Sequence, residues 1–217
     1  MSRAAVAIAL AFGFASSACS LGQGEGRVYS EKLYAEDCWF DEYDLGPDFF
    51  AAVPFRDTQQ IRIQRGSDLE EVSDGLIVLV DDTAKVRSML GEPLCVSLPP
   101  DVRPPGSPIG VDPGQGCADG PLVHMALYLQ RSCHNQNIVL YSVGGHITFQ
   151  HLFDGDPNEP SAEEKYTDAT FDDVMVGDPR DVKLGAKAYE IPADKQSRLS
   201  GNFRFYFQRG RPGQAFP

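Results

Sequence analysis

Alternation of apolar and polar residues is the clearest pattern along this chain, and it predicts β-strands. In NFRFYFQ, at 202–208, phenylalanine fills every second position and more polar side chains fill the others. VHMALYLQ, at 123–130, alternates in the same way. Because successive side chains of a strand point to opposite faces, one face of each segment belongs to a core and the other faces water.

Other short apolar runs end at turn residues and predict further strands. GLIVLVDD, at 75–82, is apolar up to its paired aspartates, so this strand is expected to be buried on both faces. Gly144 and Gly145 separate two of the runs, and a Gly-Gly pair supplies the positive φ that a two-residue hairpin turn requires. The remaining expected strands cover 61–64, 93–98, 137–143, 146–153 and 169–176.

One short helix is expected, with Asp82 or Thr83 as its N-cap and Gly91 as its stop. Strands separated by turn residues, with so little helix, predict an all-β domain. Its architecture is an antiparallel β-sandwich or, alternatively, a partly open barrel. Residues 99–120 contain too many prolines and glycines for either strand or helix, and a loop of that length in a compact domain needs a tether or carries function.

The N-terminus has the layout of a secretory signal peptide. Arg3 supplies a short positive region, residues 4–15 are uncharged and largely apolar, and small residues occupy 16–18. This run is too short for a helix that spans a bilayer, which needs about 20 apolar residues. Residues 1–18 are therefore expected to be removed as a signal peptide.

The stretch SSAC, at 16–19, resembles the lipobox of bacterial lipoproteins. The resemblance implies that the thiol of Cys19 receives a diacylglycerol and that Cys19 becomes the mature N-terminus. The family prefers leucine where this chain has Ser16, and an ordinary signal peptidase would cut at the same bond. The organisation that follows is a flexible linker at 19–26 and a single β-rich domain at 27–217.

Cysteine parity is consistent with an anchor at Cys19. The chain has five cysteines, so acylation of one leaves an even number, which an oxidising compartment would join into two disulfides. Four cysteines allow three connectivities, and four free thiols are the alternative. A zinc site is disfavoured because no CxxC pair exists. The favoured bridges are Cys95–Cys117, which would tether the long loop, and Cys38–Cys133.

The chain is acidic, with 31 Asp and Glu against 19 Lys and Arg and a formal net charge of −12. Removal of the signal peptide makes this charge one unit more negative, because Arg3 leaves with it. Phosphate would repel such a body, so no nucleic-acid partner is expected. A polybasic membrane-binding patch is not expected either.

The densest acidic stretch, at 35–50, is interleaved with aromatic residues. Carboxylates beside aromatic faces suit a calcium site or a platform for sugar rings. The candidate ligand-binding residues are Trp39, Asp41, Tyr43 and Asp44. The simpler interpretation is a solvated acidic face whose aromatic side chains point into the core.

A second acidic run, at 154–164, begins like a calcium loop, with Asp154, Asp156 and Asn158 at alternate positions. It then departs from the EF-hand pattern, which rules out an EF-hand but leaves a calcium loop of another kind. The alternative is an exposed connection between strands that holds one helical turn.

No GxSxG, HExxH or Walker loop occurs in the chain, so catalysis is not indicated. We expect a lipid-anchored cell-envelope protein that acts as a binding or structural module. Its partners would be the membrane, through Cys19, and envelope proteins or glycans, with calcium as the one cofactor that the sequence allows. Lipoproteins retained at the inner membrane commonly have aspartate after the acylated cysteine, whereas this chain has Ser20, which favours the outer membrane. Without lipidation the protein would be periplasmic or secreted. The alternative function is a secreted carboxylate-dependent hydrolase acting on glycans.

Overall fold

The computed structural model describes residues 22–66, 73–102, 122–134, 136–185 and 189–208. The predicted signal peptide, Cys19, Cys117 and most of the 99–120 loop lie outside these residues. The all-β class is confirmed. The strands are β1 (Gly24–Ala35), β2 (Trp39–Asp44), β3 (Phe49–Phe55), β4 (Thr58–Gln64), β5 (Asp74–Val80), β6 (Pro93–Cys95), β7 (Val123–Leu129), β8 (Val139–His151), β9 (Tyr166–Gly177), β10 (Lys183–Leu184), β11 (Tyr189–Glu190) and β12 (Ser197–Tyr206).

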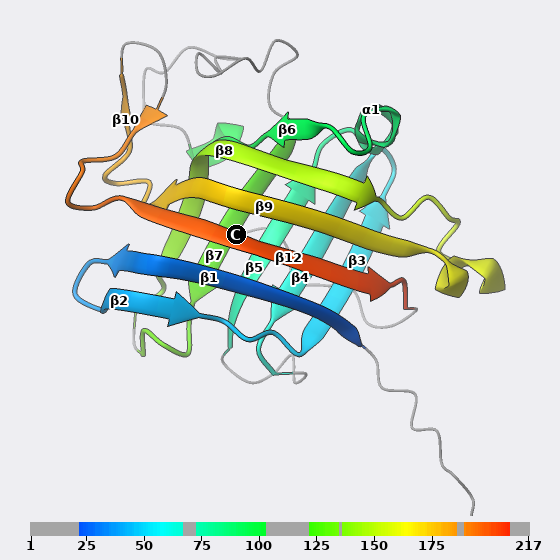
Figure 1. The fold of residues 1–217 in the computed structure, drawn as a ribbon, viewed down its shortest axis with the longest axis horizontal. Coiled ribbons are helices and arrows are strands. Elements are labelled where there is room, and N and C mark those ends of the chain that lie inside the picture. The colour runs from blue at the N-terminus through cyan, green and yellow to red at the C-terminus, as the bar shows by residue number, and fades with distance from the viewer. Residues whose placement is uncertain (1–21, 67–72, 103–121, 135, 186–188, 209–217) are drawn as a thin grey trace, which may run out of the picture.

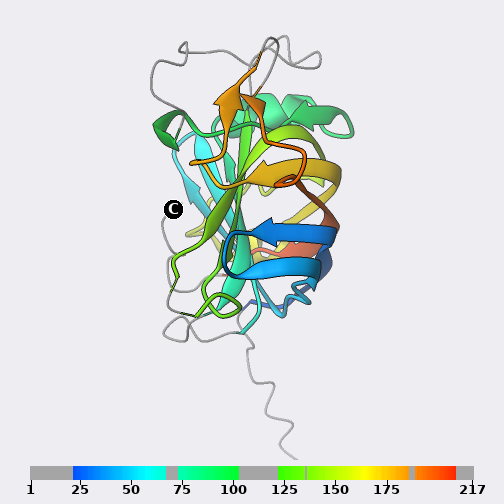
Figure 2. The same cartoon turned by 90° about the vertical axis from the view of Figure 1, so that its left-hand side faces the viewer.

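Ten of these strands form one antiparallel sheet in the order β2-β1-β12-β9-β8-β7-β5-β4-β3, with β6 paired to β8. The sheet curls into a half-barrel, so that β2, β1, β12 and β9 lie in front of and across β7, β5, β4 and β3 (Figure 1). Figure 2 shows the two layers from the side. The two layers are therefore halves of one continuous sheet. Of the two predicted architectures, this corresponds to the partly open barrel.

Strand β8 carries the sheet from the rear layer to the front layer. Its first residues pair with β7, whereas the following residues pair with β9 and β6. The hairpin turn predicted at Gly144 and Gly145 is wrong, since both glycines lie inside β8, where the β8–β9 register shifts. Gly145 has a φ of 110° there, and its carbonyl accepts a hydrogen bond from the N–H of Val96 at 3.0 Å. The glycine pair thus bends a strand instead of reversing the chain.

The hydrophobic core fills the space between the two layers. The phenylalanines of 202–208 alternate as predicted, with Phe203 and Phe205 buried and Arg204 exposed. Strand β7 departs from the prediction because every one of its residues is buried. Its His124 lies with Nδ1 2.9 Å from the carbonyl oxygen of Ser97 and Nε2 3.1 Å from a carboxylate oxygen of Asp81.

The predicted helix is present as α1 (Thr83–Ser88). The Asp82 side chain caps it by accepting a hydrogen bond from the N–H of Lys85 at 2.9 Å, which satisfies one of the unpaired donors of the first turn. Gly91 follows with a φ of 82°, as expected of a residue that ends a helix. Strand β6 is shorter than the 93–98 predicted for it.

Strand β1 begins at Gly24, so the last three residues of the predicted linker 19–26 belong to the sheet. Gly24 and Gly26 stand opposite Phe205 and Phe203 of β12. A Cβ on Gly24 would lie 2.7 Å from the Cβ of Phe205, closer than side-chain carbons approach. These glycines therefore serve close packing between strands, not flexibility.

Candidate functional site

A cleft of about 540 Å³ opens on the outward face of the front layer, where β1, β9 and β12 lie side by side. Its lining is polar and carries both signs of charge. The lining residues are Tyr29, Ser30, Glu31, Lys32, Asp172, Asp173, Ala193, Gln196, Arg198 and Ser200.

Irregular pairing in adjacent strands shapes this cleft. The register shifts between Ser30 and Leu33 in β1, and between Leu199 and Gly201 in β12. In β9, Asp173 has a φ of 57°, a conformation that interrupts a regular strand. An extra residue in a strand bends it and changes the direction of nearby side chains, so bulges in adjacent strands can produce a hollow on one face of a sheet.

Two hydrogen-bonded pairs hold the acidic wall of the cleft. Arg198 Nη1 donates to Asp173 Oδ2 at 2.6 Å, and Ser200 Oγ donates to Asp172 Oδ1 at 2.6 Å. The N–H of Asp173 donates to Ser200 Oγ at 3.0 Å. Aspartates 172 and 173 are therefore oriented before any ligand arrives, which lowers the entropic cost of binding.

Ser30 stands apart from these pairs. Its side chain is 3% exposed, and its Oγ has no hydrogen-bond partner in the described part of the chain. A buried hydroxyl without a partner costs roughly 1–3 kcal/mol. Ser30 stands opposite the buried Tyr43 of β2, and Val28 two positions earlier is also buried, so the Ser30 hydroxyl lies on the inward face of β1 and is not presented to a ligand in the outward cleft.

The cleft contains donors, acceptors and charges of both signs, and these suit a hydroxyl-rich ligand of small net charge. Its described lining residues include no histidine or cysteine to activate a nucleophile. Ser200 already donates its proton to Asp172.

The four candidate residues at 35–50 do not form one surface. Tyr43 is buried, Trp39 packs against the core, and their rings meet edge to face with centroids 5.7 Å apart. Asp41 is exposed and accepts a hydrogen bond from the N–H of its neighbour, whereas Asp44 forms an exposed ion pair with Arg27 at 2.8 Å. The stretch thus matches the simpler interpretation only in part, because Tyr43 and Phe50 are buried whereas Phe40 is 64% exposed.

All six acidic side chains of that stretch are exposed. The hydrolase alternative needs two carboxylates that converge on a scissile bond in a cleft. Residues 35–50 do not supply such a pair.

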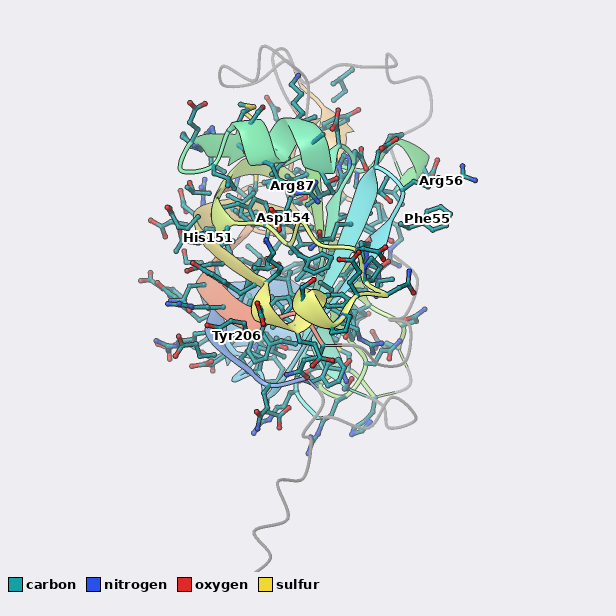
Figure 3. The ribbon with its side chains drawn as sticks, turned by 90° about the vertical axis from the view of Figure 1, so that its right-hand side faces the viewer. Phe55, Arg56, Arg87, His151, Asp154 and Tyr206 are labelled. Atoms are coloured by element: carbon teal, nitrogen blue, oxygen red, sulfur yellow. A yellow bond between two sulfur atoms is a disulfide. The ribbon has the colours of Figure 1, made fainter. Side chains whose placement is uncertain are left out.

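The predicted calcium residues lie in the connection between β8 and β9, which holds a 3₁₀ turn at Pro160–Glu164. Asp154, labelled in Figure 3, pairs with Lys165 at 3.2 Å. Asp156 accepts hydrogen bonds from both the backbone and the side-chain nitrogen of Asn158. Within the described ranges, no group of three His, Cys, Asp or Glu residues is arranged to hold a metal ion.

The predicted Cys38–Cys133 disulfide is present, with Cα atoms 5.5 Å apart. Cys95 is also disulfide-bonded, while its predicted partner Cys117 lies outside the described residues. The first bridge connects the β1–β2 turn of the front layer to the turn after β7 in the rear layer.

A buried carboxylate, Asp74, lies beside that bridge. Its Oδ1 accepts hydrogen bonds from the N–H groups of Arg131 and Ser132 at 2.9 and 3.0 Å. Its Oδ2 accepts from Ser132 Oγ and, at 3.3 Å, from the hydroxyl of Tyr43 on β2. Burial, followed by the charge and hydrogen bond of Asp74, raises the pKa of Tyr43. Asp74 thus links the edge strand of the front layer to the rear layer.

Neither the cleft nor the role of Asp74 was predicted from the sequence. One signal was present, because TFDDVMV places two aspartates in succession where an alternating strand allows one polar position. Such an interruption is typical of a bulge. Nothing local to Asp74 indicated its partners, which are 31, 57 and 58 residues away.

Comparison with family models, curated proteins and solved structures finds no match to this chain. In the described part of the chain, no helix has the length and apolar character required to cross a membrane.

Proposed function

We propose that this chain is a lipid-anchored cell-envelope protein whose half-barrel acts as a binding module, with the outward cleft as its ligand site. The observation that carries the proposal is a polar cleft whose two aspartates are held in place by hydrogen bonds from Arg198 and Ser200. A neutral, hydroxyl-rich ligand such as a glycan fits this chemistry, since its hydroxyls both donate and accept. The acidic composition opposes anionic ligands.

The anchor proposal depends on the lipobox-like SSAC stretch and on cysteine parity. Strand β1 begins five residues after Cys19, a separation that spans at most about 18 Å of extended chain. A lipid at Cys19 would therefore hold the half-barrel close to the bilayer surface. The intact mass of the protein from the membrane fraction tests this, with Cys19→Ser as the control. An unmodified Cys19 in that fraction would refute the anchor.

Calorimetric titration of the mature protein with neutral oligosaccharides tests the cleft. Arg198→Gln and Asp172→Asn should each weaken binding about tenfold or more, because each removes a charged hydrogen-bonding group. Arg56→Gln is the matched control, since Arg56 lies at the β3–β4 turn outside the cleft (Figure 3). Equal affinities for all three variants would exclude the cleft as the site.

Calcium is proposed only for the connection at 154–164. A structural calcium ion there would raise the melting temperature in millimolar calcium and lower it in chelator. A melting temperature that is the same in both would exclude it.

A further inference from the structure

Aromatic side chains gather on the same outward face, at the far end of β9 and β12 from the cleft. Tyr206 of β12 stands directly opposite Tyr166 of β9, with ring centroids 5.6 Å apart. His151 of β8 lies against Tyr166 at 4.2 Å, and the guanidinium of Arg204 lies 5.0 Å from the Tyr166 centroid. Tyr206 is 51% exposed, so this cluster faces solvent.

Outward polar residues connect the cluster to the cleft. From Ser200 in the cleft, the outward positions of β12 continue through Asn202 and Arg204 to Tyr206. Asn202 pairs with Thr170 of β9 in the same register. Six residues of strand separate Ser200 from Tyr206, or about 20 Å. The cleft and the cluster are thus the two ends of one strip along adjacent strands.

We propose that this strip binds a glycan chain of several sugar units, with one end in the cleft and a further unit on Tyr166 and Tyr206. The inference rests on the proposed function of the cleft and extends it from a short ligand to a chain. Tyrosine suits the far end because it offers an apolar face and a polar hydroxyl, as does the edge of a sugar ring.

The charges of the strip agree with a neutral chain. Arg204 stands between Asp168 of β9 and Glu25 of β1, so positive and negative groups alternate across the strands. A strongly charged polymer of either sign would meet repulsion along such a surface. Hydroxyls can bind to both kinds of group.

The experiment is a chain-length series measured by calorimetry on the mature protein. Three neutral series are used, each from one to six units: oligomers of α-1,4-glucose, β-1,4-glucose and β-1,4-N-acetylglucosamine. In the wild type, the affinity for at least one series should rise about tenfold or more as the chain lengthens. The double variant Tyr166→Ala/Tyr206→Ala should lose that rise and keep the affinity for the shortest ligand.

Phe55→Ala is the matched control, because Phe55 is an exposed aromatic residue, 65% accessible, at the β3–β4 turn. Figure 3 shows it on the other side of the molecule from His151 and Tyr206. It should keep the wild-type dependence on chain length. The exposed positions of Tyr206 and Phe55 make unfolding of these variants unexpected, and circular dichroism checks it.

The outcomes separate this inference from the proposed function. Binding that is sensitive to Arg198→Gln but independent of chain length overturns the strip and leaves the cleft. Absence of binding to all three series overturns both. The Cys19→Ser protein is also tested for binding to phosphatidylcholine vesicles. If it binds and Tyr206→Ala abolishes that binding, the aromatic cluster binds lipid and the proposal of a glycan-binding strip is overturned.

Discussion

The Cys38–Cys133 bridge should provide a large share of the stability of the fold. It joins the two layers of the half-barrel across 95 residues of sequence. Cross-linking a loop of that length stabilises the native state by about 4–5 kcal/mol in the chain-entropy model, because it restricts the unfolded chain. Domains of this kind are stable by only about 5–15 kcal/mol in total.

The perturbation is the double variant Cys38→Ala/Cys133→Ala, which removes the bridge without leaving a thiol. Equilibrium urea unfolding, followed by circular dichroism, measures the loss. With a slope of about 2 kcal/mol per molar urea, the midpoint should fall by about 2 M. The comparison is made at neutral pH under oxidising conditions, so that the bridge at Cys95 stays in place.

Two results would refute this reasoning. A midpoint within about 0.5 M of the wild type would mean that non-covalent contacts between the layers suffice, and that the bridge restricts little. A variant that unfolds in two separate transitions would mean that the layers are independent units, against the single continuous sheet.

Two further predictions concern buried polar groups, and a third concerns close contact between two strands. Asp74→Ala should cost about 3–5 kcal/mol in urea unfolding because it leaves the donors of Arg131, Ser132 and Tyr43 without their acceptor. Tyr43→Phe should cost only about 1 kcal/mol, and equal costs would contradict the arrangement at Asp74. Burial is the main cause that raises the pKa of both Tyr43 and Tyr128 above the ordinary value. The raised pKa values contribute stability that is fully present below about pH 10 and is lost as the pH rises further. Tyrosinate absorbance from these two residues should therefore appear together with unfolding. Ionisation of either residue in the folded protein at lower pH would contradict this prediction. Gly201→Ala should destabilise by about 1–3 kcal/mol because its Cβ would overlap the carbonyl oxygen of Arg27, and an unchanged melting temperature would refute that packing.

The sequence by itself determined the features that depend on neighbouring residues. Alternation at 202–208 indicated which face of β12 is buried, because a strand places successive side chains on opposite sides. Asp82 indicated the start of α1, because an N-cap needs only the next three residues. The Cys38–Cys133 bridge is different, because the sequence only favoured it among three connectivities and the structure selected it.

Only the tertiary structure decided what depends on partner strands. Gly144 and Gly145 suit a turn and a bend equally well, and the strands on either side of β8 select the bend. The glycines of β1 are also typical of a flexible linker, and only their packing against Phe203 and Phe205 of β12 shows that they belong to a strand. The cleft combines residues near 30, 172 and 198, whose proximity is set by the order of strands in the sheet. Local patterns determine the conformation of a segment, whereas pairing energy summed over the whole sheet determines which segments meet.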